Sequence, residues 1–371
     1  MVRKGTQIAL ILLFCAWIAI FGVLYLTLPG TDFSEQEKRV LASFPEVSAK
    51  TVFDGSFEAG LETWMSDHIP GRDALVGINA YYELASFRNG LGGTILAGGR
   101  LYDAPESLSA EAVSRKTEIL NRFYEKTALP MDVLIVPAAG YALEDTLPLH
   151  APYPDGELAA QVRAELREGI RLLWPEELLK ESSPAQLYYA TDHHLTSRGS
   201  YEVCRMYVES LGLTMPDASD YEIETHSDFC GSMYSQSGLW GVEPDALEIW
   251  RSRNLGGVQV SFDDREDSDD LFFPEHLAEL DKYPTFLDGN HGLVTIETEN
   301  ADAENLLMIR DSFGHCFAPF AADSFHRIVL VDLRYYRKSV QELAQEMEID
   351  RVLVLYGSDT FMTDSNFTWL R

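Results

Sequence analysis

The 371-residue chain is poor in cysteine. Of its four cysteines, Cys15 lies in an uncharged apolar run, which leaves Cys204, Cys230 and Cys316 for the rest of the chain. Three thiols allow at most one disulfide within the chain, and no C-x-x-C pair is present. We therefore expect neither a disulfide scaffold nor a metal site built on thiolates.

Positive charge is also scarce. The chain has 29 Lys and Arg against 59 Asp and Glu, which gives a formal net charge of −30. Nucleic acids and anionic membrane surfaces are bound by basic faces, so neither is an expected partner. Such an acidic excess is typical of a soluble, charged surface. No internal repeat is present, and the 46% hydrophobic content is typical of a globular protein with a buried core.

One apolar run is long enough to cross a membrane. Residues 8–28 carry no charge, and at about 1.5 Å per residue a helix over them spans a bilayer core. Arg3 and Lys4 precede the run, which predicts a cytoplasmic amino terminus and an extracytoplasmic location for the residues after the run. A cleaved signal peptide is the alternative, but no Ala-x-Ala-like site comes after the run. We predict a single-pass signal anchor in the cell membrane over residues 1–30.

Helical and strand patterns alternate along residues 31–371. Predicted helices cover residues 56–67, 74–87, 107–127, 158–173, 197–211 and about 313–323. Predicted strands cover residues 131–137, 186–190, 292–297, 306–310, 327–332 and 351–356. This alternation predicts an α/β fold with a doubly wound sheet. Turn-rich, acidic sequence at 214–290 interrupts it, so we expect one catalytic domain with an insertion.

Polar residues follow two of the predicted strands at the point where each strand ends. Asp192, His193 and His194 come just after one strand, and Ser312 comes just after another. The carboxyl ends of parallel strands meet at one edge of a sheet, where ligands bind. If both strands belong to one sheet, Ser312, His194 and Asp192 converge as a nucleophile, a base and an orienting acid.

The spacing of these residues suits such chemistry, but it is also compatible with a structural role or a metal site. Side chains two residues apart share a face of an extended segment, which brings Asp192 and His194 together. Ser312 stands before a predicted helix, whose free amides can hold an oxyanion. However, serine is also a common N-cap. Asp-His-His, with further acids such as Asp311 and Asp332, could instead form the metal site of a phosphoesterase.

Four segments together resemble the DHHW proteins, which are bacterial membrane-anchored members of the SGNH-hydrolase-like group that includes the alginate O-acetyltransferases. The segments are Thr191-Asp-His-His-Leu-Thr-Ser-Arg-Gly, Phe229-Cys-Gly-Ser-Met-Tyr-Ser-Gln-Ser-Gly, Leu306-Leu-Met-Ile-Arg-Asp-Ser-Phe and Ile328-Val-Leu-Val-Asp-Leu-Arg-Tyr-Tyr. Weaker agreement extends the likeness from about Phe33 to Leu370.

The resemblance implies a flavodoxin-like, SGNH-type three-layer α/β/α sandwich with a mostly parallel sheet. It also implies a triad for acyl transfer to or from a cell-surface polysaccharide, with Ser312 as the nucleophile, His194 as the base and Asp192 as the acid. His193 matches the other histidine of the motif and is a weaker candidate for substrate binding. No cofactor or metal is implied. Because acetyl-CoA is absent outside the cell, a transferase would need a membrane-embedded O-acyltransferase as its acetyl-exporting partner.

Two positions depart from the family pattern. Leu195 stands where the motif has its tryptophan, which removes a group that could stack on a sugar. Arg310 stands where related hydrolases have the glycine of a Gly-Asp-Ser block. A second hypothesis therefore stays open, namely a catalytically silent carbohydrate-binding or scaffold protein of an envelope-assembly complex.

Other candidate site residues lie outside the three main positions. Arg334 and Tyr335 follow the strand predicted at 327–332, and arginine with aromatic rings suits a hydroxyl-rich or anionic sugar. Packing of Tyr335 or Tyr336 under the sheet edge is the alternative. In the insertion, Tyr234 is a weaker candidate for the wall of the site, and Gly231 for an oxyanion-binding amide.

Overall fold

The computed structural model describes residues 4–27, 31–34, 36–37, 39–86, 88, 93–147, 151–181 and 184–370. The chain forms two compact units. One comprises residues 1–91 with 235–240, and the other comprises residues 92–234 with 241–371.

The first unit begins with helix α1 (Lys4–Thr27), which is long and apolar enough over Gly5–Tyr25 to cross a membrane. This agrees with a single-pass anchor, although the predicted end of the span at residue 28 lies outside the described residues. The elements that follow are the strand pair β1 (Phe33–Ser34) and β2 (Arg39–Val40) and the helices α2 (Ala49–Phe53), α3 (Ser56–Asp67) and α4 (Arg72–Ala85). The helices predicted at 56–67 and 74–87 are confirmed, except that Phe87 is not among the described residues.

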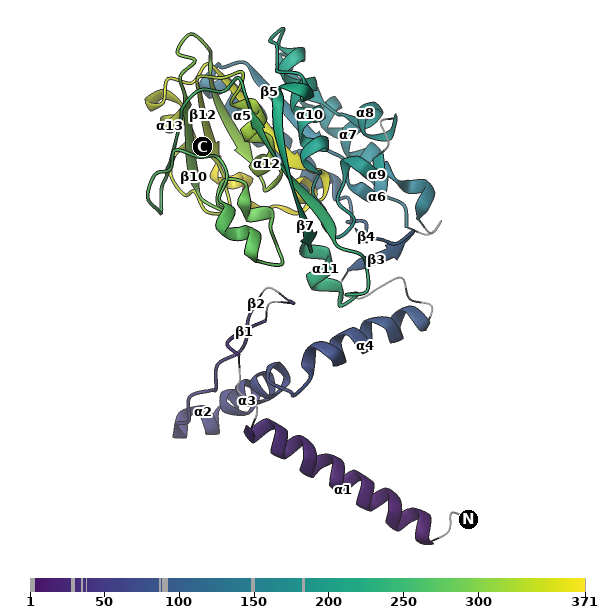
Figure 1. Cartoon of the computed structure of the whole chain (residues 1–371). Helices are drawn as coiled ribbons and strands as arrows, with labels where there is room; N and C mark the ends of the chain where they lie inside the picture. Colours follow the sequence, from purple (N-terminus) through teal and green to yellow (C-terminus); the bar gives the residue numbers. More distant parts are fainter. Residues whose placement is uncertain are drawn as a thin grey trace. The chain divides into compact units, whose positions relative to one another are not determined.

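The second unit is built on a seven-stranded sheet with the order β6-β5-β13-β11-β12-β10-β9. Figure 1 labels three of these strands, β5, β10 and β12. The strands are β5 (Met131–Val136), β6 (Ile170–Leu173), β9 (Val258–Phe262), β10 (Leu293–Thr298), β11 (Asn305–Arg310), β12 (Arg327–Val331) and β13 (Arg351–Gly357). The first five strands in this order run parallel, and β10 pairs antiparallel with both β12 and β9. The mixed α/β class and five of the six predicted strands are confirmed.

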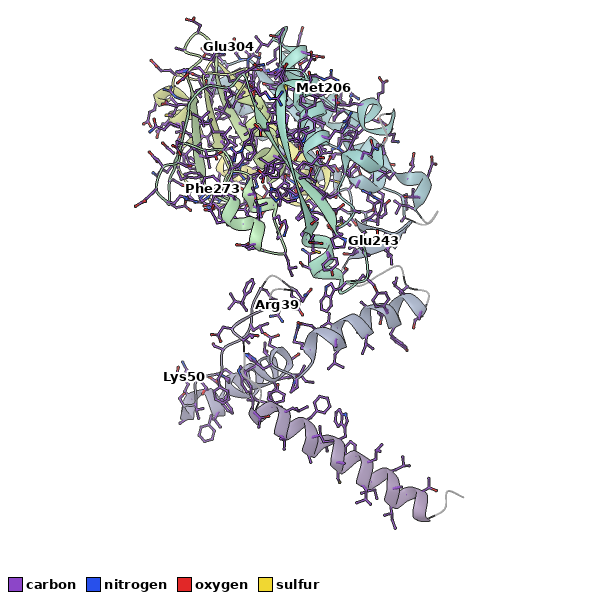
Figure 2. All side chains as sticks on the ribbon, viewed as in Figure 1. Arg39, Lys50, Met206, Glu243, Phe273 and Glu304 are labelled. Atoms are coloured by element: carbon purple, nitrogen blue, oxygen red, sulfur yellow. The ribbon has the colours of Figure 1, made fainter. Side chains whose placement is uncertain are left out.

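The central strands are buried on both faces. Leu306 and Met308 belong to one apolar cluster, whereas Leu307 and Ile309 belong to another, because successive side chains of a strand point to opposite faces. Side chains fill the space on both sides of the sheet (Figure 2). The first cluster includes side chains of α10 (Ser197–Ser210) and α12 (Phe313–Ala321), and the second includes side chains of α5 (Ala110–Thr127), α7 (Asp155–Glu165) and α13 (Val340–Glu346).

Smaller elements surround this frame. They are the hairpins β3 (Thr94–Ala97) with β4 (Arg100–Asp103) and β7 (Tyr221–Phe229) with β8 (Asp245–Ser252), and the helices α6 (Ala139–Ala142), α8 (Glu176–Glu181), α9 (Pro184–Leu187), α11 (Ser232–Ser237) and α14 (Ser358–Thr363). The insertion predicted at 214–290 is therefore more regular than its turn-rich sequence suggested. Its strand β9 even extends the main sheet.

Two sequence predictions are wrong. The helix predicted over 158–173 ends at Glu165, and the chain turns through Gly169, at a φ of 98°, into strand β6. The strand predicted over 186–190 does not join the sheet. Leu187 ends helix α9, and Tyr188 makes an isolated antiparallel bridge with Leu195. This segment is apolar because it is buried, and a short buried turn has the same composition as a buried strand.

Candidate active site

The position of Ser312 is fixed by the junction between strand β11 and helix α12. Its backbone is helical, with φ −65° and ψ −17°, and its side chain does not cap α12. The neighbouring Asp311 instead binds backbone amides, accepting hydrogen bonds from Phe313 N at 2.9 Å and from Gly357 N at 2.8 Å. The junction is thereby tied to the carboxyl end of β13, and the Ser312 hydroxyl remains available for other contacts.

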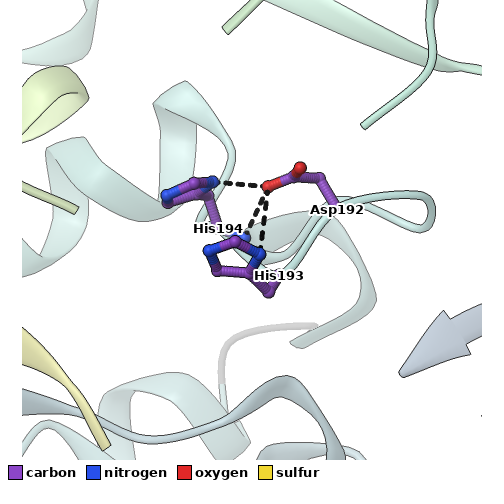
Figure 3. A group of neighbouring side chains, drawn as sticks. All are labelled: Asp192, His193 and His194. Carbon is purple, nitrogen blue, oxygen red and sulfur yellow. Dashed lines mark hydrogen bonds and ion pairs between the residues drawn. The ribbon is translucent and has the colours of Figure 1, made fainter. Parts of the chain in front are cut away.

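A line of hydrogen bonds runs from Ser312 to a buried acid. The Nε2 atom of His194 lies 2.7 Å from Ser312 Oγ, and its Nδ1 atom lies 2.5 Å from Asp192 Oδ1. Figure 3 shows both rings of the His-His pair facing that carboxylate. The three residues proposed from the sequence as nucleophile, base and acid thus lie in hydrogen-bond contact. These residues come together although the strand predicted at 186–190 does not form, because Asp192 and His194 lie on a buried turn.

The second oxygen of Asp192 is bound by the insertion. Ser232 donates to Asp192 Oδ2 from its amide at 2.7 Å and from its hydroxyl at 2.9 Å. Gly231 is needed for this approach, since a Cβ there would lie 2.2 Å from Asp192 Cβ. Burial would raise the pKa of Asp192, but electrostatic interaction with the imidazoles of His194 and His193 and the hydrogen bonds from His194 and Ser232 hold it well below its usual range.

The environment of His194 keeps its ring neutral at neutral pH. Burial and the positive charge of His193 lower the pKa of His194 to about 4, against the opposing effect of Asp192. The carboxylate at Nδ1 favours the tautomer with its proton on that nitrogen. Nε2 then presents a lone pair to the Ser312 hydroxyl, which is the arrangement of a general base.

The turn that carries these residues is anchored by an acid that sequence reasoning missed. Asp245, at the start of β8, accepts hydrogen bonds from Ala190 N at 2.8 Å, Thr191 N at 2.7 Å and Thr191 Oγ1 at 2.6 Å. The Thr191 hydroxyl also accepts the amide of Gly231 at 3.1 Å. No local pattern around Asp245 signals this role, because its partners lie more than 50 residues away.

Comparison with known proteins identifies the family. A model described as DHHW protein matches residues 37–110 and 165–331, more than half of the chain. The chain belongs to the DHHW family. It is similar to a solved DHHW family protein from Eubacterium siraeum, with 21% identity, a TM-score of 0.66 and coverage of 75% of this chain and 95% of that one. No curated protein matches the chain.

A second solved structure similar to this DHHW protein is Bacillus cereus PatB1 with a sulfonyl adduct. The two share 18% identity and a TM-score of 0.65, over 75% of this chain and 98% of that one. A weaker likeness, with a TM-score of 0.46 and 12% identity, is to the O-acetyltransferase domain of Pseudomonas putida AlgJ, over 73% of this chain and 93% of that one. The two stronger likenesses show that the α/β fold is shared.

The two departures of this DHHW protein from the motif pattern have structural causes. Leu195 is 3% exposed and pairs with Tyr188 inside the core, so this position does not offer a surface to a sugar. Arg310 is fully buried, with Nη1 2.6 Å from His315 Nε2 and 3.2 Å from Asp332 Oδ2. Burial and the charge of Arg310 lower the pKa of His315 well below its usual range, so that its neutral ring accepts from the guanidinium.

The weaker candidates fall into different environments. Arg334 binds Asp332 through Nε and Nη2 and donates to Asn290 Oδ1 at 3.1 Å, so its charge is already paired. Tyr335 is 53% exposed and does not pack under the sheet edge, whereas Tyr336 is buried in an apolar cluster. The Gly231 amide is committed to Thr191, so the oxyanion role expected for it is not supported.

The other two candidates lie near the triad. The amide of Tyr234 donates to the carbonyl of Thr191 at 3.0 Å, and its side chain is half-buried. The half-exposed ring of His193 lies 4.0 Å from that of His194, with Nδ1 3.0 Å from Ser232 Oγ. Of the histidine pair, His193 is therefore the more exposed ring.

The metal hypothesis can be tested against the donor atoms. Asp192, His193 and His194 each offer a ligand atom within 4.8 Å of the others. However, both oxygens of Asp192 already accept hydrogen bonds. The further acids proposed for a phosphoesterase are committed too, since Asp311 binds backbone amides and Asp332 pairs with arginines. The donor set fits a hydrogen-bonded relay better than a metal centre.

Proposed function

We propose that this DHHW protein is a membrane-anchored serine acyltransferase or esterase that acts on a cell-envelope polysaccharide outside the cytoplasm. The observation that carries the proposal is the relay from Ser312 Oγ through His194 to Asp192, with hydrogen bonds of 2.7 and 2.5 Å. A nucleophile, a base and an orienting acid in hydrogen-bond reach are the requirements of acyl transfer through a serine.

In the first half-reaction, His194 Nε2 takes the hydroxyl proton while Ser312 Oγ attacks the carbonyl carbon of an acetyl ester. The tetrahedral intermediate collapses by breaking the bond to the leaving oxygen, which receives the proton from His194. In the second half-reaction, His194 deprotonates a sugar hydroxyl or water, which attacks the acetyl-serine. The Ser312 oxygen then leaves and recovers the proton. Asp192 stays ionised throughout and stabilises the imidazolium.

The oxyanion of each intermediate needs a donor. At the start of α12, Phe313 N donates to the Asp311 side chain, Gly314 N to the Asp311 carbonyl and His315 N to the Ser312 carbonyl. These amides are engaged within the turn. The amide of Ser312 itself is therefore the candidate for holding the oxyanion.

Fold and location complete the proposal. The likeness to the two structures with TM-scores of 0.66 and 0.65 supports a flavodoxin-like, SGNH-type three-layer arrangement of the second unit. The predicted orientation of α1 leaves this unit outside the cytoplasm, where acetyl-CoA is absent. A transferase would then take its acetyl group from a membrane-embedded, acetyl-exporting O-acyltransferase, and its own chemistry needs no cofactor.

The direct test is intact-mass spectrometry of the full-length protein in detergent after brief exposure to a sulfonyl fluoride or an activated acetyl ester. Sulfonyl reagents modify activated serines, and the similar PatB1 structure holds a sulfonyl adduct. We expect one adduct that maps to Ser312 and is absent in Ser312→Ala and His194→Ala. The exposed Ser365 provides the control, since Ser365→Ala should react like the wild type. A folded protein that forms no adduct would favour the silent scaffold hypothesis.

A further inference from the structure

The ring of Tyr283 stacks on the imidazole of His194. The ring centroids are 3.9 Å apart and the planes differ by 11°. Other rings meet His194 at steeper angles, 35° for His193 and 58° for Phe313, so among these contacts Tyr283 gives the most parallel one. Tyr283 also donates its hydroxyl to the carbonyl of Ser312 at 3.3 Å. One buried side chain thus contacts both the base and the backbone of the nucleophile.

This geometry suits a charged imidazole better than a neutral one. Two neutral aromatic rings prefer offset or edge-to-face arrangements, because each face carries negative potential. A cation over a ring face is instead attracted by that potential, most strongly where water is excluded. Tyr283 and His194 are each 5% exposed, so water screens their contact little.

The insertion holds Tyr283 in place. The residue opens a short 3-10 helix, Tyr283–Thr285, and its amide donates to Asp281 Oδ1 at 3.0 Å. Phe286 packs edge-on against its ring at 5.4 Å. Because backbone and ring are both fixed, Tyr283 can hold the imidazole plane in line with the Ser312 hydroxyl.

A strained turn follows this helix. Leu287 and Asp288 have φ values of 54° and 58°, a region that costs energy for residues other than glycine. The carboxylate of Asp288 bonds His276 Nε2 at 2.7 Å and also Arg265. These contacts hold the turn that directly follows the 3-10 helix of Tyr283.

Several charged groups also act on His194. Asp192 favours the imidazolium, whereas the positive charges of His193 and Arg334 oppose it, and His315 is close enough to interact with it. Burial opposes it further. Asp192 is thus the carboxylate with the strongest effect on His194, and it acts against both burial and the neighbouring positive charge, so a second stabilising contact matters for proton transfer.

We propose that Tyr283 is a positioning residue that stabilises the His194 imidazolium formed when Nε2 takes the proton of Ser312. This inference rests on the proposed function, because it concerns the base of that reaction. Tyr283 touches neither the scissile bond nor the substrate oxygen in this mechanism. It acts through the orientation of the imidazole and through the negative potential of its own ring face.

The test varies the ring potential at constant shape. Three variants of the full-length protein in detergent are compared with the wild type: Tyr283→Phe, Tyr283→3,4,5-trifluorophenylalanine and Tyr283→Leu. Their hydrolysis of 4-nitrophenyl acetate is followed from pH 3 to 9. We expect kcat to fall in that order, to a total loss of roughly 3- to 30-fold, with little change in KM. As kcat falls along this series, the acid limb of kcat/KM should move to lower pH, because a less stabilised imidazolium forms at lower pH.

Two controls separate this proposal from packing effects and from the reaction itself. The same trifluoro substitution at Phe123, a buried ring in the apolar cluster on the other face of the sheet, should leave the rate and the pH profile unchanged. If the Phe and trifluoro variants at position 283 have equal kcat values and equal acid limbs, and Ser312→Ala is still inactive, the proposed role of Tyr283 is wrong but the proposed function stands. Wild-type activity in Ser312→Ala would overturn both proposals. Because the fluorinated ring keeps its shape, the comparison does not depend on whether Tyr283→Leu folds.

Discussion

Two buried histidines contact Ser312, and they differ in the charge of their partners. His194 reaches the hydroxyl through Nε2 and has a carboxylate at Nδ1, whereas the amide of His315 donates to the Ser312 carbonyl and its ring faces the guanidinium of Arg310. Burial lowers the pKa of both rings. Only the ring beside a carboxylate can take a proton at low cost, because a second positive charge next to a buried guanidinium is repelled. His194 thus combines the contact with the serine hydroxyl and the carboxylate partner that a base needs, whereas the His315 ring is hydrogen-bonded to a guanidinium.

The largest difference should appear when each histidine is removed. We expect His194→Ala to lower kcat for 4-nitrophenyl acetate hydrolysis by roughly 10⁵- to 10⁶-fold, because the hydroxyl loses its base. His315→Gln keeps an acceptor for Arg310 and should leave kcat within about tenfold. Comparable losses in the two variants, both folded by circular dichroism, would contradict the division of roles.

The carboxylate that distinguishes the two sites can be neutralised without changing its shape. Asp192→Asn should lower kcat by roughly 10⁴-fold, because the amide no longer stabilises the imidazolium or fixes the tautomer. Asp270→Asn, which alters a half-exposed ion pair with Arg251, serves as the control and should keep wild-type kinetics. A loss below tenfold in Asp192→Asn would remove the acid from the mechanism.

The arginine that distinguishes the other histidine should matter for stability. Arg310→Met leaves the ring of His315 without its donor and one side of Asp332 unpaired, so we expect the free energy of unfolding to fall by about 3–5 kcal/mol. The urea midpoint of the full-length protein measures this. Arg122→Met breaks an exposed pair with Glu118 and should leave the midpoint unchanged. A stable Arg310→Met protein would mean that the buried network is replaceable.

The smallest expected effect is on pH dependence. The pKa of His194, lowered to about 4, means that the base form persists as pH falls from 7 and is lost only near pH 4. The acid limb of kcat/KM should therefore lie well below the value of about 6.5 expected for an ordinary histidine. His193→Gln removes a neighbouring positive charge and should move the limb to higher pH. A limb near 6.5 in the wild type would indicate a solvated base.

The strands and the position of Ser312 could be predicted from the sequence. An apolar run from Leu306 to Ile309, followed by polar residues and a helical pattern, is sufficient to place Ser312 at a strand end, because backbone conformation follows local periodicity. The sequence also predicts that Asp192 and His194 lie close together, but the structural reason is wrong, since the predicted strand before them is a buried turn. Spacing of two residues brings acid and imidazole together in that turn as well.

The supporting contacts could not be predicted in the same way. Asp245 and Tyr283 lie about 50 and 90 residues from the turn they hold, in a region that the sequence marked only as an acidic insertion. In the sequence, Arg310 stands where related hydrolases have a glycine, and this difference favours the hypothesis of a catalytically silent protein. The buried network around its guanidinium accounts for the substitution instead.

The sequence by itself determined the apolar helix that is long enough to cross a membrane, the alternation of strands and helices and the residue types able to transfer an acyl group. These properties depend on hydrophobic patterning and on the chemistry of single side chains. Only the tertiary structure decided which imidazole faces a carboxylate, which faces a guanidinium and which ring stacks on His194. Those contacts join atoms on segments far apart in the chain, and the electrostatic environment of a side chain exists only once they meet.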